Sequence, residues 1–488
     1  MARPKLALAR VNYSQLYKVY DGGKTFRQRD ILAPYQLLSL AGYVREQGAE
    51  VAIFDGEVDL LTEEALAKQI VAWRPDFVGF TATTPDIEQT IEACRLVKEG
   101  NPSIATILGG VHATVLPEDV AGHDCVDHVV VGDGEKPLAQ IVAECRTPRR
   151  PLARDDARQK ILYGRREELT SLPMPAHDLL DYADYQFTDL TRGRINTASV
   201  MSARGCPFSC SFCARTPDVR YRTAGEFVAE VEYLYREKGV RYFFVYDDVF
   251  VVKRSRVLSI LEQLRALNLS DAHFQCQARA NLLDEELLAA LRATNFVRVS
   301  IGIESGSAEM LERCNKGVTK PHCRAACSMI RSTGIEPRAS FIIGFPYETR
   351  ATAEATIAFS QELDLLHANF TVMTPYPGTK VYDIACRKEG LRFVKPEYAR
   401  EWSVFRRWGN PIVETDELTS GELEALRERA VMEFYTQDKV FRYYESLFRG
   451  GNRSRYFYRP LNFAWQRKFG RDIPFWVQLD SVEMIAPS

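Results

Sequence analysis

The chain has 488 residues, of which 46% are hydrophobic and 26% are charged, a balance typical of a folded protein with about three domains. Its formal net charge of -2 gives no support for a nucleic-acid partner. The sequence shows no secretory signal and no apolar run approaching the roughly 20 residues of a transmembrane segment. The 11 cysteines are scattered and odd in number, as in proteins of a reducing compartment. We therefore expect a cytoplasmic protein.

The first region, residues 1–145, alternates short apolar runs with helical patterns. Segments such as "PYQLLSLAGYVREQG" repeat apolar residues every three or four positions and stop at glycine. Five such units predict an α/β domain with a doubly wound, Rossmann-like parallel sheet, whose ligands bind at the carboxyl ends of the strands. The expected strands cover residues 5–9, 50–54, 76–82, 104–110 and 127–134.

Small and polar residues gather where three of these strands end. Glycines allow a backbone to approach a large ligand, and hydroxyls supply hydrogen bonds. Each glycine taken alone is equally well explained as an ordinary turn residue, but the three loops share one rim of the sheet, which favours a pocket. The candidates are Thr81, Thr83, Thr84, Gly109, Gly110, His112, Gly132, Gly134 and Glu135.

Residues 146–195 are rich in charge and proline and are expected to be a linker. A second alternation of strand and helix patterns then fills residues 196–405. It predicts six parallel strands, and therefore a partial (β/α)6, TIM-like barrel with its site at the strand carboxyl ends. The expected strands begin at 198 and cover 241–248, 273–279, 297–306, 338–346 and 369–379.

Three cysteines, Cys206, Cys210 and Cys213, follow the first strand of this second region in a CxxxCxxC spacing. Structural zinc takes four ligands, which usually arrive as two pairs, and no second pair of this kind is present. Three thiolates suit a four-iron four-sulfur cluster in which one iron has no protein ligand. That iron requires a ligand from outside the protein.

"CPFSCSFC" resembles the cluster loop of radical S-adenosylmethionine (SAM) enzymes. "IGIESGSAEML" and "FIIGFPYET" are similar to the fourth- and fifth-strand motifs of that family, and "PYPGTKVYD" resembles the branch with an N-terminal cobalamin-binding domain. "GGVHAT" and "VVVGDGEKPL" resemble that domain itself, which makes the rim residues above cobalamin-binding candidates. The resemblance covers about residues 1–400.

The resemblance implies a mechanism and a set of SAM-binding residues. The open iron would chelate SAM, and one-electron reduction would give methionine and a 5'-deoxyadenosyl radical. Asp247 and Asp248 would meet the methionine amine and Arg279 a carboxylate, although a helix cap or a plain ion pair also explains these charges. Ribose contacts would come from the fourth strand and the adenine shelf from the fifth. The full set is Phe212, Asp247, Asp248, Arg279, Glu304, Ser305, Gly344, Phe345 and Pro346.

The first domain departs from the DxHxxG cobalamin signature. The loop after its first strand, "RVNYSQLYKVYDGG", contains no histidine to bind cobalt from below. His112 is expected to be a hydrogen-bonding loop residue in preference to a cobalt ligand. Members of the resembled branch leave cobalt five-coordinate, with water or another side chain beneath it.

Residues 406–488 are expected to form a mainly helical C-terminal region, with a long helical pattern at 419–448. The segment 448–471 mixes arginines and lysines with aromatic residues and has no acidic residue. Such a segment suits an anionic substrate, an acidic carrier or peripheral contact with a membrane surface, and it is also explained as a solvated face.

The leading functional hypothesis is a cobalamin-dependent methyltransferase that acts on an unactivated centre of a small molecule, lipid or pigment precursor. The same cofactors could instead support oxidative cyclisation or ring contraction. A hypothesis of another class is a non-catalytic iron-sulfur and cobalamin scaffold or sensor. The chemistry also implies a flavodoxin- or ferredoxin-like electron donor. Candidates for quenching a substrate radical, equally explained by core packing, are Tyr246, Tyr376 and Tyr382.

Overall fold

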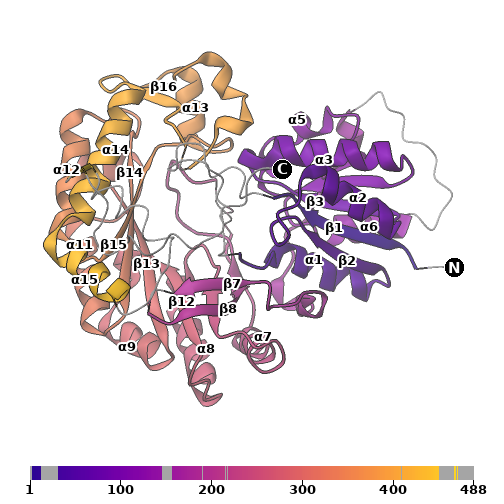
Figure 1. The fold of residues 1–488 in the computed structure, drawn as a ribbon, viewed down its shortest axis with the longest axis horizontal. Coiled ribbons are helices and arrows are strands. Elements are labelled where there is room, and N and C mark those ends of the chain that lie inside the picture. The colour runs from indigo at the N-terminus through magenta and orange to yellow at the C-terminus, as the bar shows by residue number, and fades with distance from the viewer. Residues whose placement is uncertain are drawn as a thin grey trace.

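The computed structural model describes two packed lobes. It covers residues 3–12, 31–144, 157–189, 191–214, 216, 218–407, 409–449, 467–468 and 470. The N-terminal lobe lies on the right of Figure 1 and an open half-barrel on the left. Within the described residues, no helix combines the length and the apolar character needed to cross a membrane.

The N-terminal lobe is a six-stranded parallel sheet in the order β2-β1-β3-β4-β5-β6. Helices cover both faces, which confirms the expected doubly wound fold (Figure 1). The strands are β1 Lys5–Arg10, β2 Glu50–Asp55, β3 Phe77–Thr81, β4 Ala105–Gly109, β5 His128–Val131 and β6 Ile161–Tyr163. The helices are α1 Tyr35–Glu46, α2 Glu63–Trp73, α3 Ile87–Gly100, α4 Val111–Val115, α5 Pro117–Ala121 and α6 Glu135–Glu144.

The second lobe is a seven-stranded sheet in the order β15-β14-β13-β12-β11-β8-β7. Six strands are parallel and follow chain order, as a partial barrel requires, and β7 pairs antiparallel with β8. The strands are β7 Gln186–Asp189, β8 Gly193–Val200, β11 Tyr242–Val245, β12 His273–Ala278, β13 Phe296–Glu304, β14 Glu336–Ile343 and β15 His367–Val372. The helices are α7 Ala224–Glu237, α8 Arg254–Ala266, α9 Glu285–Ala293, α10 Ala308–Arg313, α11 Lys320–Ser332, α12 Arg350–Glu362 and α13 Lys380–Arg387.

The two faces of the half-barrel differ in character. Along β14, buried and half-buried residues alternate without a break. The outward face packs on the helices, where the rings of Phe243, Phe274 and Phe296 stack at 5.0 and 5.2 Å. The other face carries polar residues, including the exposed Gln277 of β12. A parallel sheet covered on both faces would be apolar throughout, so this alternation marks an open, polar inner face.

The expected linker at 146–195 contributes to both sheets. Its apolar "ILY" run forms β6 of the first sheet, and its last part forms β7 of the second. The structure therefore differs from the expected division at 145 and 195. The charge and proline content of this region predicted a linker, but two of its short segments pair with neighbouring strands and extend the sheets.

The C-terminal region begins differently from the expected boundary at 405. The strands β16 Leu391–Phe393 and β17 Val413–Thr415 pair antiparallel, so the boundary falls inside one hairpin. The expected long helix is present as α14 Ser420–Tyr435 and α15 Asp438–Arg449. Most of the basic, aromatic segment at 448–471 lies outside the described residues.

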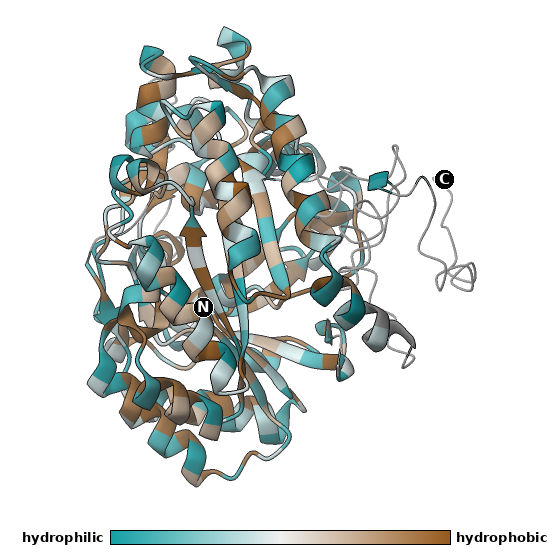
Figure 2. Ribbon diagram, turned by 90° about the vertical axis from the view of Figure 1, so that its left-hand side faces the viewer, coloured by the Kyte–Doolittle hydropathy of each residue, from teal (hydrophilic) through white to brown (hydrophobic). Residues whose placement is uncertain are grey.

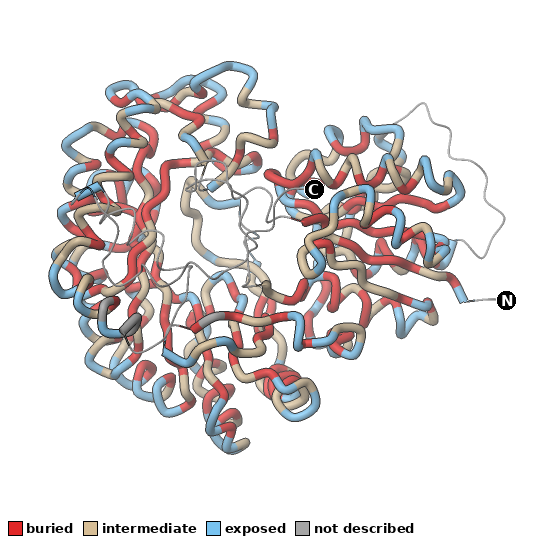
Figure 3. The backbone as a smooth tube through the Cα atoms, in the orientation of Figure 1, coloured by how far each residue is buried: buried red, intermediate tan, exposed pale blue. Residues whose placement is uncertain are grey.

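The two lobes share one apolar core. Ile87 and Val120 of the first lobe belong to the same buried cluster as Met310, Trp402 and Phe405 of the second. Figure 3 shows many buried residues along the strands of both sheets, and Figure 2 shows hydrophobic residues on both strands and helices. This shared core joins the lobes into a single packed unit.

A substitution at the rim of the first sheet tests the backbone there. Gly110 has φ +97°, and a Cβ would come within 2.5 Å of the Ala82 carbonyl oxygen. We expect Gly110→Ala to lower the free energy of unfolding by about 1–3 kcal/mol, measured by denaturant titration. Gly421→Ala is the control, because Gly421 lies in α14 with no atom near its Cβ position. That control should be neutral or stabilising by up to about 1 kcal/mol, and an equal loss in both variants would contradict the strain argument.

Candidate active site

The three cysteines lie on a loop at the carboxyl-end rim of the half-barrel. The loop is the tip of a short hairpin formed by β9 Ala203–Arg204 and β10 Arg220–Tyr221. The Cys206 amide donates to the Thr216 carbonyl at 2.9 Å. The Ser211 amide donates to the Cys314 carbonyl at 2.9 Å, and the Val381 amide donates to Ser211 at 3.1 Å. The C-terminal end of α10 and the start of α13 therefore hold the loop in place.

The donor set fits an iron-sulfur cluster better than a single ion. Among the described residues, no group of three His, Cys, Asp or Glu side chains converges on one metal position. Cluster ligands each bind a different iron, so their sulfurs need not converge. Cys206, Cys210 and Cys213 all carry free thiols. Burial and the charge of Asp248 raise the pKa of Cys206, and raise the pKa of Cys213 to about 11, so ligation must displace protons.

Two cations lie beside the cysteine loop. The Arg279 guanidinium lies 3.9 Å from Cys210 Sγ and stacks 3.8 Å over the ring of Phe208. Lys316 is buried, donates to Glu304 Oε1 at 2.8 Å, and lies 5.7 Å from the ring of Phe212. Cations here offset the negative charge that thiolates and cluster bring. The sequence analysis missed Lys316, because no local pattern links it to Glu304 twelve residues earlier.

Glu304 occupies a strained position at the end of β13. Its φ is +70°, and the pairing with β14 shifts register between Gly302 and Glu304. A Cβ at Gly302 would lie 2.1 Å from Glu304 Oε1, so only glycine allows this side chain to fold back. Such bulges re-aim side chains next to functional sites. Ser305 is different: it is fully buried and shares a 2.9 Å hydrogen bond with Thr356 of α12, which turns its hydroxyl away from the site.

The two neighbouring aspartates at the end of β11 have separate roles. Asp247 is 1% exposed and accepts the Ser202 and Ala203 amides at 2.6 and 3.1 Å. It also accepts the Ser202 hydroxyl, and burial raises its pKa to about 6. Asp247 therefore supports the base of the hairpin, and its expected contact with the methionine amine stays a prediction. Asp248 is exposed, and its charge acts on the cluster thiols.

The turn after β14 packs against the cysteine loop. Phe345 meets Phe212 edge to face at 5.6 Å. Glu348, which the sequence analysis did not single out, accepts the amides of Gly344 and Phe345, the latter at 3.0 Å. Burial raises the pKa of Glu348 to about 7. This carboxylate fixes the turn that contains Gly344, Phe345 and Pro346.

The rim of the first sheet is only partly available to a ligand. Thr81 ends β3 and Gly109 ends β4, while Gly110 precedes α4, whose first residue, Val111, is an apolar residue left 55% exposed. Thr83 caps the turn at 84–86 through Asp86. Gly132 and Gly134 lie in the loop between β5 and α6.

His112, also expected at this rim, is fully buried. Its ring lies 3.2 Å from Thr84 Oγ1 and 3.5 Å from Asp119 Oδ2, with Trp402 packed edge to face at 5.1 Å. Glu135 is 1% exposed and pairs with Arg204. Neither side chain therefore reaches a ligand on the open rim.

The two rims meet directly. Gly378, in the loop after β15, approaches so closely that a Cβ there would lie 2.6 Å from Val115 of α4 and 3.8 Å from Ala214 of the cysteine loop. The expected cobalamin rim and the cluster loop therefore lie side by side. Ligands of parallel sheets bind at the carboxyl ends of the strands, so sites on these two rims would be neighbours.

Of the three candidate tyrosines, Tyr246 alone is exposed. Tyr246 ends β11 and is 48% exposed. Tyr382 donates to the Ala399 carbonyl at 2.7 Å, and burial raises its pKa to about 12. Tyr376 packs 6.2 Å from Phe405 in the shared core. Packing therefore accounts for Tyr376 and Tyr382.

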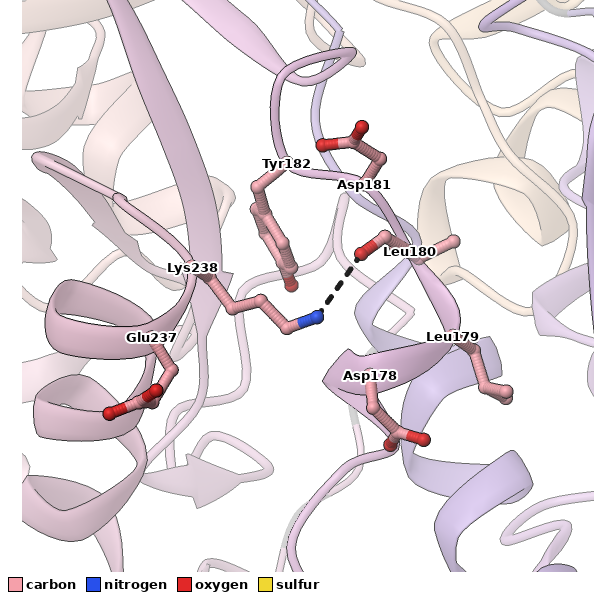
Figure 4. Close-up of a pocket in the computed structure, with 7 residues that line it drawn as sticks. All are labelled: Asp178, Leu179, Leu180, Asp181, Tyr182, Glu237 and Lys238. Carbon is pink, nitrogen blue, oxygen red and sulfur yellow. Dashed lines mark hydrogen bonds between the residues drawn. The ribbon is translucent and has the colours of Figure 1, made fainter.

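A separate hollow of about 440 Å³ lies between the 3-10 turn at 177–179 and the end of α7 (Figure 4). Lys238 donates across it to the Leu180 carbonyl at 3.5 Å. Its lining includes three acidic residues and one lysine and contains none of the candidate site residues: Asp178, Leu179, Leu180, Asp181, Tyr182, Glu237 and Lys238.

Comparisons with known proteins agree with this geometry. The B12 binding domain family matches residues 29–142, and the radical SAM superfamily matches residues 200–360. An uncharacterized methyltransferase of Pyrococcus horikoshii is 31% identical over 424 residues, covering 83% of this chain and 88% of that protein. The anaerobic magnesium-protoporphyrin IX monomethyl ester cyclase of Rubrivivax gelatinosus is 28% identical over 80% of this chain and 71% of its own length.

The fold also matches a solved structure of the cobalamin-dependent SAM radical enzyme OxsB with aqua-cobalamin and SAM bound. The TM-score is 0.70 at 16% identity, over 96% of this chain and 72% of that chain. Fold and site thus define a radical SAM protein with a B12-binding domain. With the P. horikoshii relative covering most of both chains, the protein belongs to the cobalamin-dependent radical SAM methyltransferase family, whose cofactors are a four-iron cluster, SAM and cobalamin.

The raised pKa of Glu348 predicts a pH effect on stability. Its pKa of about 7 in the fold exceeds the ordinary 4.5, so the folded state holds a proton that the unfolded chain releases. The free energy of unfolding should therefore fall by up to about 3 kcal/mol from this group as pH rises from 4.5 to 7. We expect Glu348→Gln to remove that loss. The free energy of unfolding of the variant should therefore rise relative to that of wild type as the pH increases from 4.5 to 7, as measured by denaturant titration. The exposed Glu309→Gln should show a constant difference, and the same constant difference for Glu348→Gln would refute the argument.

Loss of a cluster ligand gives a direct test of the cysteine loop. We expect Cys206→Ala to lose most of the iron that wild type takes up in anaerobic reconstitution, because a four-iron cluster held by two thiolates is poorly retained. Iron analysis and the visible spectrum measure this. Cys386→Ala, at an exposed cysteine of α13, should keep the full iron content.

Proposed function

We propose that the protein transfers a methyl group to an unactivated carbon or phosphorus centre of a small-molecule, lipid or pigment precursor. The observation that carries this proposal is the close approach of the cluster loop and the rim of the first sheet at Gly378. A methyl donor held on one rim and a radical source held on the other would reach one substrate between them.

When bound, the iron-sulfur cluster supplies the electron that opens SAM, and cobalamin supplies the methyl group. Each turnover consumes two SAM molecules and two electrons. It yields the methylated product, methionine, 5'-deoxyadenosine and S-adenosylhomocysteine, and the hydrogen lost by the substrate leaves in 5'-deoxyadenosine. An external donor of the flavodoxin or ferredoxin type would deliver the electrons.

The protein's own residues would bind and orient these partners. Cys206, Cys210 and Cys213 would hold the cluster. Arg279, already beside Cys210, would meet the SAM carboxylate, and the exposed Asp248 would meet its amine. Packing of Phe212 on Phe345 would close the adenine side against water.

Further SAM and cobalamin contacts follow from position. Glu304 would contact the ribose if SAM binding breaks its ion pair with Lys316. Ser305 would support the turn, and Gly344 and Pro346 would line the adenine side. Cobalamin would lie over Thr81, Thr83, Gly109, Gly110, Gly132 and Gly134, with Thr84, His112 and Glu135 acting behind them. Tyr246, which is 48% exposed, would give a proton or hydrogen atom to a substrate species. A cytoplasmic location suits this chemistry, since all described cysteines are free.

A second candidate is oxidative cyclisation with the same cofactors. It is favoured by the 28% identity to the R. gelatinosus cyclase over 80% of this chain. Cyclisation would use one SAM as oxidant without transferring its methyl group. The two reactions therefore differ in their products from SAM.

Product analysis separates the two functions. We expect the reduced, reconstituted enzyme with SAM and its substrate to form 5'-deoxyadenosine and S-adenosylhomocysteine in equal amounts, and to move a deuterated methyl group from SAM into the product. Mass spectrometry and chromatography measure both. Turnover with 5'-deoxyadenosine alone, and no label in the product, would favour cyclisation. Absence of 5'-deoxyadenosine under all reducing conditions would favour a non-catalytic role.

A further inference from the structure

The hairpin that carries the cysteine loop is joined to the first lobe by buried ion pairs. Arg204, the residue two before Cys206, donates from Nη2 to Glu135 Oε1 at 2.7 Å and to Ser39 Oγ at 3.0 Å. Arg220, at the other side of the hairpin, pairs with Asp133. Asp133 lies in the loop between β5 and α6, and Glu135 is the first residue of α6, at the carboxyl rim of the first sheet.

These pairs are well shielded from water. Glu135 is 1% exposed, and side-chain exposures of Arg220 and Asp133 are 9% and 14%. Burial alone would raise the pKa of Asp133, but Arg220 and Arg204 outweigh it and the pKa is lowered, so the carboxylate stays ionised. The carboxylate of Asp133 is therefore held beside the guanidinium of Arg220 in a region of low dielectric.

The pairs are also incompletely satisfied. Within the described part of the chain, Glu135 Oε2 and Arg220 Nε are buried without a hydrogen-bond partner. Buried ion pairs of this kind contribute little net stability compared with apolar residues of similar size. Their directional geometry, by contrast, fixes how two surfaces meet.

A third arginine extends the contact. Arg222, directly after β10, pairs with the buried Glu230 of α7 and donates to the Met201 carbonyl at 3.1 Å. It also lies 3.3 Å from the hydroxyl of Tyr35 in α1. The hairpin base is thereby fixed to the half-barrel while its outer side contacts the first lobe.

We propose that the pairs Arg204–Glu135 and Arg220–Asp133 form a clamp that sets the position of the cobalamin rim relative to the cluster loop. The four residues are positioning residues, and Glu135 acts through Arg204 instead of touching cobalamin. The glycines of the same loop, Gly132 and Gly134, alternate with the two acids. Residues 132–135 thus border the proposed cobalamin site and fix its position relative to the cysteine loop. This inference rests on the proposed function only in taking cobalamin as the ligand of this rim. The two ion pairs themselves are present in the structure.

The test compares Glu135→Gln and Asp133→Asn with wild type, because both changes keep shape and remove charge. The control is Arg45→Gln, which breaks an exposed ion pair between α1 and Asp178, with side-chain exposures of 41% and 51%. All proteins are reconstituted with iron, sulfide and hydroxocobalamin, and iron, cobalt and melting temperature are measured first. Comparable values show that each variant folds and takes up its cofactors.

The deciding readout is electron paramagnetic resonance of the protein with cobalt(II) and a reduced cluster. In wild type and in the Arg45→Gln control we expect the two signals to be broadened by their mutual interaction. In the clamp variants we expect that broadening to decrease. With substrate, the ratio of methylated product to 5'-deoxyadenosine should fall about tenfold or more, because small displacements of reacting groups have large effects on rate.

A second measurement covers variants that load poorly. Hydrogen exchange on the cofactor-free proteins should show faster exchange at residues 132–136 and 203–206 in the clamp variants than in the control. Unchanged resonance and exchange in both clamp variants would overturn the clamp. If wild type forms no methylated product but shows these spectral differences, the methyltransferase proposal fails while the clamp stands.

Discussion

Two parallel sheets with their carboxyl edges turned toward each other impose the arrangement of every candidate group in this protein. Each strand of a parallel sheet delivers its loop to the same edge, so the cysteine loop, Arg279, Glu304 and the turn at Gly344 all arrive at one rim. The first sheet presents its own rim in the same way. The shared apolar core then joins the two lobes, and the rims meet at Gly378.

The charges at the half-barrel rim suit the groups that would bind there. Thiolates, a cluster and the carboxylate of SAM would all add negative charge, and the rim supplies Arg279 and buried Lys316 beside Cys210 and Phe212. The acidic residues near this rim differ among themselves in burial. Asp247 and Glu348 are buried acceptors of backbone amides, which shape turns, whereas Asp248 remains exposed toward the thiols. Similar residue types therefore have structural or binding roles according to burial.

The inner face of the half-barrel fits chemistry in a confined, polar space. Alternation along β14 and the exposed Gln277 of β12 leave hydrogen-bonding groups in the concave side. The hard steps of the proposed reaction belong to the cofactors, so the protein needs to orient partners and limit water. A shared core and an ion-paired contact between lobes are well suited to orientation, because neither allows a small, continuous shift of one rim against the other.

The sequence by itself determined the two α/β units and the positions of most of their strands, and it singled out Cys206, Cys210 and Cys213, because these depend on periodicity and on close spacing along the chain. It did not separate Asp247 from Asp248, and it placed His112 and Glu135 among rim residues although both are buried. It also missed Lys316 and Glu348. Only the tertiary structure decided these roles. Burial and partner choice depend on residues distant in sequence, as for Glu135, whose partner Arg204 is 69 positions away, and no local pattern records such a contact.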